Sequence, residues 1–488
     1  MKSLTNRALN LAEVQGASYA DVRIVERRTQ NISVKNGIVE ALADSESRGL
    51  GVRVLAAGAW GFASSADLSP AEIDRVTALA VRIARASARF KSHKVRLGPP
   101  VTSTGSYRTP VKIDPWEVSL EEKIDLLLRA NAGLRVPGVR VATANLTIWR
   151  EKKTFASSEG AYIEQELIET GGGIEATAVD TAAGEVQKRS YPNSFGRDQR
   201  GEGWEAILAM DLPGNAEQVG SEAVALLSAD PCPSGITTVI LGPTQLALQV
   251  HESCGHPIEL DRVFGTEASY AGTSFLTPEK YRSFRYGSEI VNFTADATTP
   301  GGLGTFGWDD EGVPAQRLPI VRDGIFCGYL TSRETVQQLR EIVGDKAPEQ
   351  SGGTMRADGW GRIPIIRMTN VNLEPGEWEF DDLVADTDDG IYMEVNKSWS
   401  IDDKRLNFQF GTEMAYEIKK GKLGRMLKNA TYTGITPQFW ASCDAICNEN
   451  HWRIWGTANC GKGQPGQTAH TGHGTAPARF RKVRVGVK

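Results

Sequence analysis

The sequence predicts an α+β protein with two domains, and three observations support this prediction. Helical patterns and short strands are mixed in the first half, whereas the second half carries many short strands and few helices. Strands and helices do not alternate regularly enough for a doubly wound parallel sheet. A chain of 488 residues also exceeds what one hydrophobic core usually serves. We expect an N-terminal helix-plus-antiparallel-sheet domain over residues 1–230 and a mainly β C-terminal domain over residues 231–488.

The first domain is expected to open with a helix over residues 3–14, which Gly16 ends. Asn36-Gly37 then predicts a tight turn within a run of strands. The strands are expected at residues 20–27, 29–34, 39–43, 49–55 and 60–63. Short strands joined in this way predict an antiparallel meander.

Two further helices are expected in this domain. Residues 70–89 carry apolar side chains at spacings of three and four, which places them on one helix face against the sheet. These side chains are Ile73, Val76, Ala80 and Ile83. After a linker at residues 99–105, Ser119 and Glu122 have the form of a capping box and start the second helix.

Strand patterns return between residues 139 and 180, where Ser158-Glu159-Gly160 separates two strands. A helix is expected at residues 215–228. The stiff segment Pro231-Cys232-Pro233-Ser234-Gly235 follows it and is the expected domain boundary. Beyond the boundary, one more helix is expected near residues 332–343.

An apolar strand at residues 235–241 leads through Pro243 into a helix that carries His251-Glu252-Ser253-Cys254-Gly255-His256. Two neutral imidazoles can hold a zinc ion, while the adjacent glutamate takes a proton from a water molecule. Residues five apart point about 140° apart on a regular α-helix, so an unbroken helix cannot present both histidines to one ion. Gly255 and Pro257 favour a distorted or terminated helix, in which a π-bulge can absorb the extra residue.

A third ligand must come from elsewhere in the chain. Cys460 lies in Asn459-Cys460-Gly461-Lys462-Gly463-Gln464-Pro465-Gly466-Gln467, which contains too much Gly and Pro to predict regular structure. A thiolate on such a loop is a plausible ligand for the ion.

The paired motifs HESCGH and NCGKGQPGQ resemble the metal-binding TldD branch of the TldD/PmbA family of metallopeptidases. The resemblance covers nearly the whole chain and includes Asp309-Asp310-Glu311-Gly312, Arg367-Met368-Thr369-Asn370 and Thr412-Glu413-Met414-Ala415-Tyr416. It implies one zinc ion per chain bound by His251, His256 and Cys460, with Glu252 as the catalytic base. It also implies cleavage of small peptides or unfolded polypeptides.

Similar proteins enclose their site in a two-fold assembly. The resemblance therefore implies a homodimer, or a heterodimer with a metal-free PmbA-type relative. The sequence itself does not distinguish these two assemblies.

A rival metal set is present near the C-terminus. Cys443, Cys447 and His451 recur every fourth residue and would share one face if this segment were helical. The segment is rich in aromatic residues, and free cysteines are often buried, so it is also typical of a packing segment.

Other side chains near the motifs are expected to have supporting roles. Cys254 is expected to face the core side of its helix. His470 and His473 lie on the same tail as Cys460 and are candidates to support the ligands without binding the ion. Asp309-Asp310-Glu311 is expected to form an acidic turn rather than a catalytic carboxylate pair.

Composition limits the other functions of the chain. A formal net charge of −5 and a pI near 5.9 give no basic surface for nucleic acid. No signal peptide or membrane-spanning segment is apparent, and six cysteines without a disulfide-rich small domain are typical of a reducing compartment. We therefore expect a cytoplasmic protein that binds neither nucleic acid nor membrane.

Two alternatives of other functional classes stay open at this point. The chain could be a peptide-binding or regulatory module whose metal is structural. It could also be a zinc oxidoreductase, although no dinucleotide fingerprint follows a strand.

Overall fold

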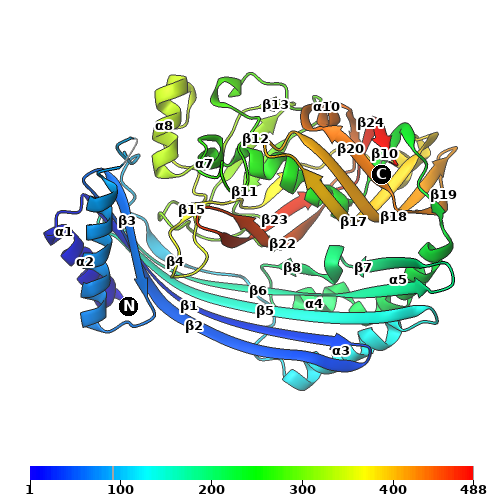
Figure 1. Cartoon of the computed structure of the whole chain (residues 1–488), viewed down its shortest axis with the longest axis horizontal. Helices are drawn as coiled ribbons and strands as arrows, with labels where there is room; N and C mark the ends of the chain where they lie inside the picture. Colours follow the sequence, from blue (N-terminus) through cyan, green and yellow to red (C-terminus); the bar gives the residue numbers. More distant parts are fainter. Residues whose placement is uncertain (91–92, 487–488) are drawn as a thin grey trace.

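Two eight-stranded sheets organise the computed structural model, which describes residues 1–90 and 93–486 (Figure 1). The first sheet has the order β3-β2-β1-β5-β6-β4, with β7 and β8 also paired to β6. The second has the order β17-β10-β24-β20-β18-β19-β9, with β21 paired to β24. The α+β class is confirmed. Among the described residues, the first sheet contains no strand after β8. The domain boundary at residue 230 stays a prediction. Residues 487 and 488 of the expected second domain lie outside the described residues.

The N-terminal strands are longer than expected. Helix α1 (Lys2–Val14) precedes β1 (Tyr19–Lys35), β2 (Ile38–Ala56) and β3 (Ala59–Ser65). The sequence predicted two short strands in place of each of β1 and β2, and this prediction was wrong. In β2, residues 38–48 are all exposed and carry no alternating apolar pattern, so the sequence does not show that the strand is continuous. Backbone pairing with β1 holds them in the strand. The turn between the two strands is at Asn36-Gly37 as predicted, with φ of 49° and 82°.

Helix α2 (Pro70–Ser87) packs against β3, and α1 packs against α2 (Figure 1). Ile73, Val76 and Ala80 are fully buried as predicted. Ile83 is 37% exposed, so its assignment to the buried face was wrong. The buried stripe continues instead through Ala84, which lies over Gly61 of β3.

The opposite end of the first sheet is covered by α3 (Leu120–Leu134) and α5 (Leu212–Ser228). The Ser119 hydroxyl accepts a hydrogen bond from the Glu122 N–H at 3.1 Å, which is half of the expected capping box. Helix α5 starts three residues earlier than predicted, because the Asp211 side chain caps the N–H of Gly214. The expected linker at residues 99–105 overlaps β4 (Thr104–Arg108), which pairs with β6 in parallel.

The remaining elements of this sheet follow the predicted hairpin pattern around Ser158-Glu159-Gly160. They are β5 (Val139–Ser157), β6 (Tyr162–Asp180), β7 (Glu185–Tyr191), the 3-10 turn η1 (Ser194–Gly196), β8 (Asp198–Arg200) and α4 (Glu205–Met210). The segment from β7 to β8 lies between the long strands and the second sheet (Figure 1).

The second sheet surrounds helix α6 (Pro243–Val250) with the largest hydrophobic core of the molecule. Its strands are β9 (Asp230–Pro231), β10 (Gly235–Leu241), β17 (Asp389–Ile401), β18 (Asn407–Lys419), β19 (Lys422–Lys428), β20 (Thr431–Ile435), β21 (Cys443–Ile446) and β24 (Ala478–Val485). The helices in this half of the chain include α7 (Leu260–Val263), α8 (Arg333–Val343), α9 (Phe380–Ala385) and α10 (Thr436–Ala441). Ser332 caps α8, which agrees with the predicted helix near residues 332–343.

Smaller sheets pack beside this core. One contains β11 (Phe293–Asp296), β12 (Arg317–Arg322), β13 (Ile325–Phe326) and β16 (Val371–Leu373). Two-stranded sheets pair β14 (Met355–Arg356) with β15 (Ile365–Ile366) and β22 (Arg453–Lys462) with β23 (Gln467–Thr475). Among the described residues, none of the helices combines the length and apolar character that crossing a bilayer would require.

The acidic segment Asp309-Asp310-Glu311 forms a turn as predicted, but all three side chains are buried. Asp310 lies 2.7 Å from Lys153 Nζ, and Glu311 lies 3.3 Å from Arg53, so the segment joins the second half of the chain to the first sheet. Burial, together with the charge of Glu311, raises the pKa of Asp309 to about 8. The turn therefore carries buried ion pairs and is not a solvent-exposed acidic turn.

The packing of α2 on β3 predicts the effect of adding one methyl group. In Gly61→Ala the new Cβ would lie 2.1 Å from the Ala80 carbonyl oxygen and 2.5 Å from the Ala84 nitrogen, both in the helix backbone. We expect a loss of about 1–3 kcal/mol in the free energy of unfolding, because the helix must move away from the sheet. Thermal unfolding should show a lower Tm. Gly361→Ala is the control, because no atom lies within 4 Å of its added Cβ; equal stability of the two variants would contradict this packing account.

Candidate metal centre

The helix that carries the two histidines changes its winding at His251. Helix α6 continues as a π-helical turn over His251–Gly255 and then as a 3-10 turn over His256–Ile258. The extra residue is absorbed as the five-residue spacing predicted, and the rings of His251 and His256 lie 4.9 Å apart. Gly255 allows Met368 to pack closely, because a Cβ at this position would lie 2.1 Å from Met368 Sδ.

Cys460 reaches the two histidines from strand β22, where it pairs with Ala469 of β23. The prediction of an irregular loop at this position was therefore wrong. The register shifts between Thr457 and Cys460, and this bulge re-aims the side chain. Cys460 Sγ lies 3.7 Å from His256 Nε2, and the ligand atoms of His251, His256 and Cys460 all lie within 4.8 Å of one another.

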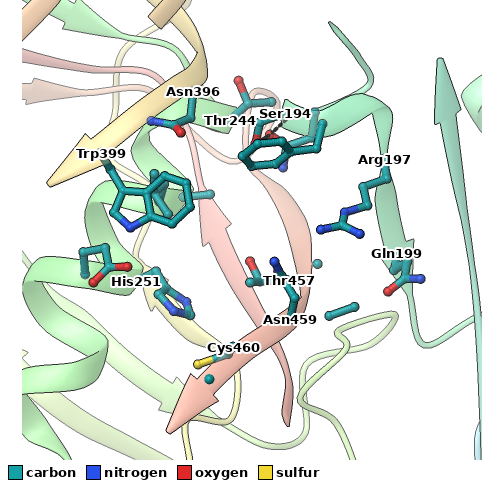
Figure 2. Close-up of a pocket in the computed structure, with 18 of the residues that line it drawn as sticks. Ser194, Arg197, Gln199, Thr244, His251, Asn396, Trp399, Thr457, Asn459 and Cys460 are labelled. Atoms are coloured by element: carbon teal, nitrogen blue, oxygen red, sulfur yellow. Dashed lines mark hydrogen bonds between the residues drawn. The ribbon is translucent and has the colours of Figure 1, made fainter. Parts of the chain in front are cut away.

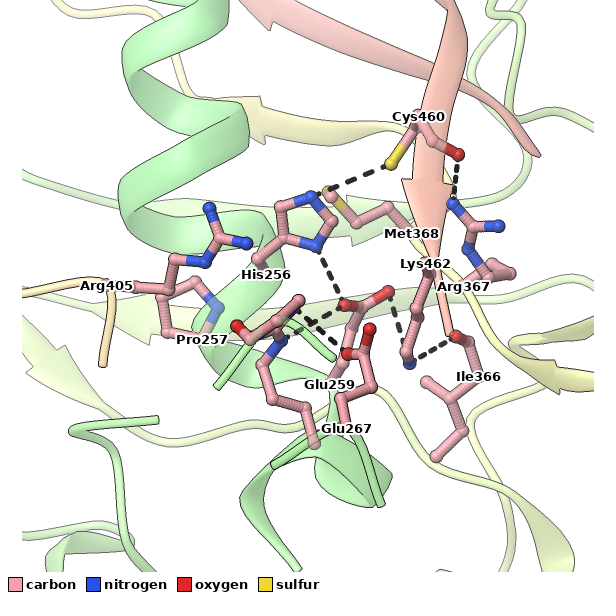
Figure 3. Close-up of polar contacts among 12 residues, drawn as sticks. His256, Pro257, Glu259, Glu267, Ile366, Arg367, Met368, Arg405, Cys460 and Lys462 are labelled. Carbon is pink, nitrogen blue, oxygen red and sulfur yellow. Dashed lines mark hydrogen bonds and ion pairs between the residues drawn. The ribbon is translucent and has the colours of Figure 1, made fainter. Parts of the chain in front are cut away.

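Hydrogen bonds fix which ring nitrogen of each histidine faces this cluster. The Nδ1 atom of His256 lies 2.9 Å from Glu259 Oε2, so it carries the proton and leaves Nε2 with a free lone pair toward Cys460 (Figure 3). Glu259 itself is buried beside Lys462, whose Nζ lies 3.5 Å from Oε1.

His251 is oriented by a second histidine. Its Nδ1 lies 2.7 Å from Nε2 of His473, and Nδ1 of His473 lies 3.1 Å from the Val371 carbonyl oxygen. A carbonyl oxygen can only accept, so Nδ1 of His473 donates and its Nε2 accepts from Nδ1 of His251. The Nε2 atom of His251 is thereby left unprotonated. His473 fulfils the supporting role that the sequence suggested.

The electrostatic surroundings favour the protonation states that bind a cation. Burial lowers the pKa of both His251 and His256, which keeps the rings neutral at pH 7. Burial alone would raise the pKa of the Cys460 thiol, but the positive charge of Arg367 opposes burial, and the pKa lies below its ordinary value. Arg367 is held close because its guanidinium also donates to the Cys460 carbonyl oxygen (Figure 3). Two neutral imidazoles and a thiolate-prone cysteine are a donor set that fits a zinc ion.

Glu252 lies beside this cluster and is held by a cation. Its Oε2 accepts a hydrogen bond from Arg405 Nη1 at 2.5 Å, and Arg405 lies between β17 and β18 with φ of 63°. Glu252 lies outside the group of possible ligands among the described residues. The carboxylate is thus oriented next to the ligands without being one of them.

The cluster opens into a cavity of about 290 Å³ between the β7–β8 segment and the second half of the chain (Figure 2). His251, Glu252, His256 and Cys460 all line this cavity. A ligand site with access to a cavity can receive a further molecule, as a catalytic metal site requires.

The rival metal set is not assembled. Cys443 lies in strand β21, which ends at Ile446, so Cys443, Cys447 and His451 do not lie on one face of a helix. His451 Nε2 lies 2.7 Å from Glu379 Oε2 instead. Within the part of the chain that the structure describes, His251, His256 and Cys460 form the single candidate metal cluster.

The two remaining candidates near the motifs, Cys254 and His470, contact other parts of the chain. Cys254 is fully buried in the core, as predicted. His470 interacts with Glu169 and with the Trp149 ring, so it does not support the metal cluster.

Sequence reasoning missed three residues that organise the site, which are Glu259, Arg367 and Arg405. Glu259 could have been found from its position three residues after His256, which places the two on one side of a helical turn. Arg405 follows Glu252 by 153 positions in the chain, and no local pattern connects the two residues.

Comparisons with family models and known proteins show the relatives of this chain. Family models match residues 20–84 as "PmbA/TldA metallopeptidase domain 1", residues 113–229 as the central domain and residues 234–487 as the C-terminal domain. "Metalloprotease MJ0996" of Methanocaldococcus jannaschii is 29% identical, over 96% of this chain and 97% of that protein. A "Metalloprotease TldD homolog" of Haemophilus influenzae is 24% identical, over 99% and 96%.

Two solved structures share the fold. A putative modulator of a DNA gyrase from Thermotoga maritima has a TM-score of 0.77 at 17% identity, covering 99% of this chain and 100% of that one. TldE from Thermococcus kodakarensis has a TM-score of 0.74 at 15% identity, covering 99% of both chains. Because the family models together match most of the sequence, the chain belongs to the PmbA/TldA metallopeptidase family.

Proposed function

We propose that this protein is a zinc-dependent peptidase that cleaves small peptides or unfolded polypeptides. The observation that carries the proposal is the convergence of His251, His256 and Cys460 at the end of an open cavity, beside an oriented glutamate. Family membership supports the peptidase class. The zinc ion, the peptide substrate and the role of Glu252 are proposals that the following experiments test.

One zinc ion per chain would be held by Nε2 of His251, Nε2 of His256 and Sγ of Cys460. Bound zinc would supply Lewis-acid chemistry, polarising the scissile carbonyl and making a water molecule more acidic. Three protein ligands leave a coordination position open, which is the arrangement of catalytic rather than structural sites. Glu259 and His473 keep the ring nitrogens of the ligands pointed at the ion.

Glu252 is the proposed general base. Arg405 holds its Oε2 atom, which leaves Oε1 to accept a proton from the attacking water. The same carboxyl group then donates that proton to the leaving amine. A positioned acid–base group of this kind contributes a factor of about 10² to 10⁴ in rate.

We also propose that the protein works in the cytoplasm as a homodimer or as a heterodimer with a metal-free relative. All six cysteines are free, as expected in a reducing compartment. In the described part of the chain, β3 pairs with residues 50–56 of β2 and leaves the outer edge of residues 38–48 without a strand. Unpaired strand edges with exposed apolar side chains, here Ile38 and Leu42, favour association with another chain.

The ligand assignment predicts different results for two buried cysteines. Cys460→Ser should strip or greatly weaken zinc binding, because the thiolate ligand is lost, whereas Cys443→Ser should retain one zinc ion per chain. Elemental analysis after dialysis measures the metal content. Loss of zinc from the Cys443 variant alone would make the rival cysteine segment the metal site.

The proposed base predicts that Glu252→Gln loses peptide cleavage while it keeps zinc and peptide binding. Glutamine retains the size of the side chain but cannot take the proton, so kcat should fall by about 10²- to 10⁴-fold. Rates on an unstructured peptide, with zinc content measured in parallel, check this result. Cleavage at the parental rate with zinc intact would remove Glu252 from the mechanism. A zinc-loaded parent that cleaves none of a panel of peptides would instead favour a binding or regulatory module with a structural metal.

The proposed assembly predicts a particle of at least two chains in solution. Light scattering at the concentration of the activity assay measures its mass. Replacing Ile38 and Leu42 by Lys should lower that mass if the β2 edge is the contact, because charges oppose edge pairing. A fully active monomer would contradict the proposed assembly.

A further inference from the structure

Arg197 lies on the wall of the cavity that holds the candidate metal ligands, and no carboxylate of the described residues pairs with it. It is exposed, lies between η1 and β8, and lines the same cavity as the ligands. Figure 2 shows its guanidinium group pointing into the cavity, across from His251 and Cys460. Within the described part of the chain, its guanidinium carbon lies 6.0 Å from the centroid of the Phe195 ring.

The other basic residues of this segment are all paired. Lys188 lies 3.1 Å from Glu175, Arg189 lies 2.8 Å from Glu222, and Arg200 lies 3.1 Å from Asp198. Among the described residues, Arg197 has no such ion pair. The neighbouring cations are thus paired with carboxylates of the same chain, whereas Arg197 faces the space that a substrate would enter.

The charges lining the cavity are few. Besides Arg197 they are Glu252 and Arg405, which neutralise each other across a 2.5 Å contact. Among the described residues that line the cavity, Arg197 is therefore the cation that no carboxylate neutralises. An anionic group of a ligand is favoured in such a cleft, since no lining carboxylate other than Glu252 competes for the guanidinium.

The walls around Arg197 provide apolar cover and hydrogen-bonding groups. Phe195 and Trp399 are 41% and 45% exposed, come from different halves of the chain, and meet edge to face at 6.2 Å. Phe195 has φ of 61°, which is rare for a bulky residue. The side chain of Asn459 also lines the cavity and makes no hydrogen bond within the described residues, so it is free to contact a ligand.

We propose that Arg197 binds a carboxylate of the peptide substrate and makes the cavity favour peptides that present a carboxylate to it. The carboxylate is either the C-terminus of the peptide or the side chain of Asp or Glu, and both match the planar, two-pronged guanidinium. This inference rests on the proposed peptidase function. It assigns Arg197 to substrate selection and leaves the hydrolytic step to the residues of the metal cluster.

Short, unstructured Ala/Ser peptides test the inference with the zinc-loaded full chain. One series is amidated and neutral, a second has a free C-terminus, and a third is amidated with a single Glu, Gln or Lys at successive positions. The measurements are kcat/KM for the parent, Arg197→Gln, Arg197→Glu and Arg82→Gln. Arg82 is an exposed arginine of α2 outside the cavity and is the matched control.

We expect the parent to prefer one carboxylate-bearing series over its neutral counterpart by roughly tenfold, the usual scale of a hydrogen bond to a charged group. R197Q should lose this preference, R197E should shift it toward the Lys peptides, and R82Q should keep it. A preference abolished by amidation identifies the C-terminal carboxylate, whereas a preference for internal Glu over Gln identifies a side chain. Equal rates for acidic and neutral peptides in the parent, or an unchanged preference in R197Q, would overturn the inference.

Binding measurements separate this result from a failure of the proposed function. Fluorescence anisotropy of labelled peptides on zinc-loaded E252Q and on the double variant R197Q/E252Q reports carboxylate selection without cleavage. Should the parent cleave none of the peptides, the peptidase proposal fails, while tighter binding of acidic peptides that R197Q removes still supports the role of Arg197. Identical binding of acidic and neutral peptides would reject that role.

Discussion

The site depends on two hydrogen bonds that each hold a ring nitrogen of a histidine. Glu259 accepts from Nδ1 of His256, and His473 accepts from Nδ1 of His251. An imidazole can turn and can carry its proton on either nitrogen, so without these partners neither lone pair would be fixed in direction. With them, both Nε2 atoms are free and face the Cys460 thiol side of the cavity. The fold therefore prepares the ligands before an ion binds.

The same few elements supply both the ligands and their supports. The β22–β23 hairpin carries Cys460 on one strand and His473 on the other, so one pair of strands places a ligand and an orienting residue. Lys462 of this hairpin reaches Asp261 at 2.6 Å and lies beside the buried Glu259, whose negative charge it compensates (Figure 3). The π-turn is anchored separately, since Tyr286 and Trp440 bond to Ser253. Displacement of the hairpin would disturb both histidines together with the cysteine.

The sequence predicted those features that depend on local chemistry. The five-residue spacing of His251 and His256, with Gly255 between them, was enough to predict a distorted helix, and Asn36-Gly37 was enough to predict a turn. Features that depend on pairing between distant segments were missed. The exposed half of β2 has no apolar alternation, and the glycines around Cys460 resemble a loop, although strand pairing makes both segments regular. The contact of Arg405 with Glu252 arises when the β17–β18 connection reaches the helix, and no sequence pattern encodes it.

X-ray absorption at the zinc edge of the zinc-loaded protein tests the central claim most directly, because it reads the ligand atoms without any substitution. The account predicts one sulfur ligand at about 2.3 Å and nitrogen or oxygen ligands at about 2.0–2.1 Å, with imidazole scattering from two histidines. That result matches the donor set of His251, His256 and Cys460. A spectrum without sulfur, or with two or more sulfur ligands, would contradict it.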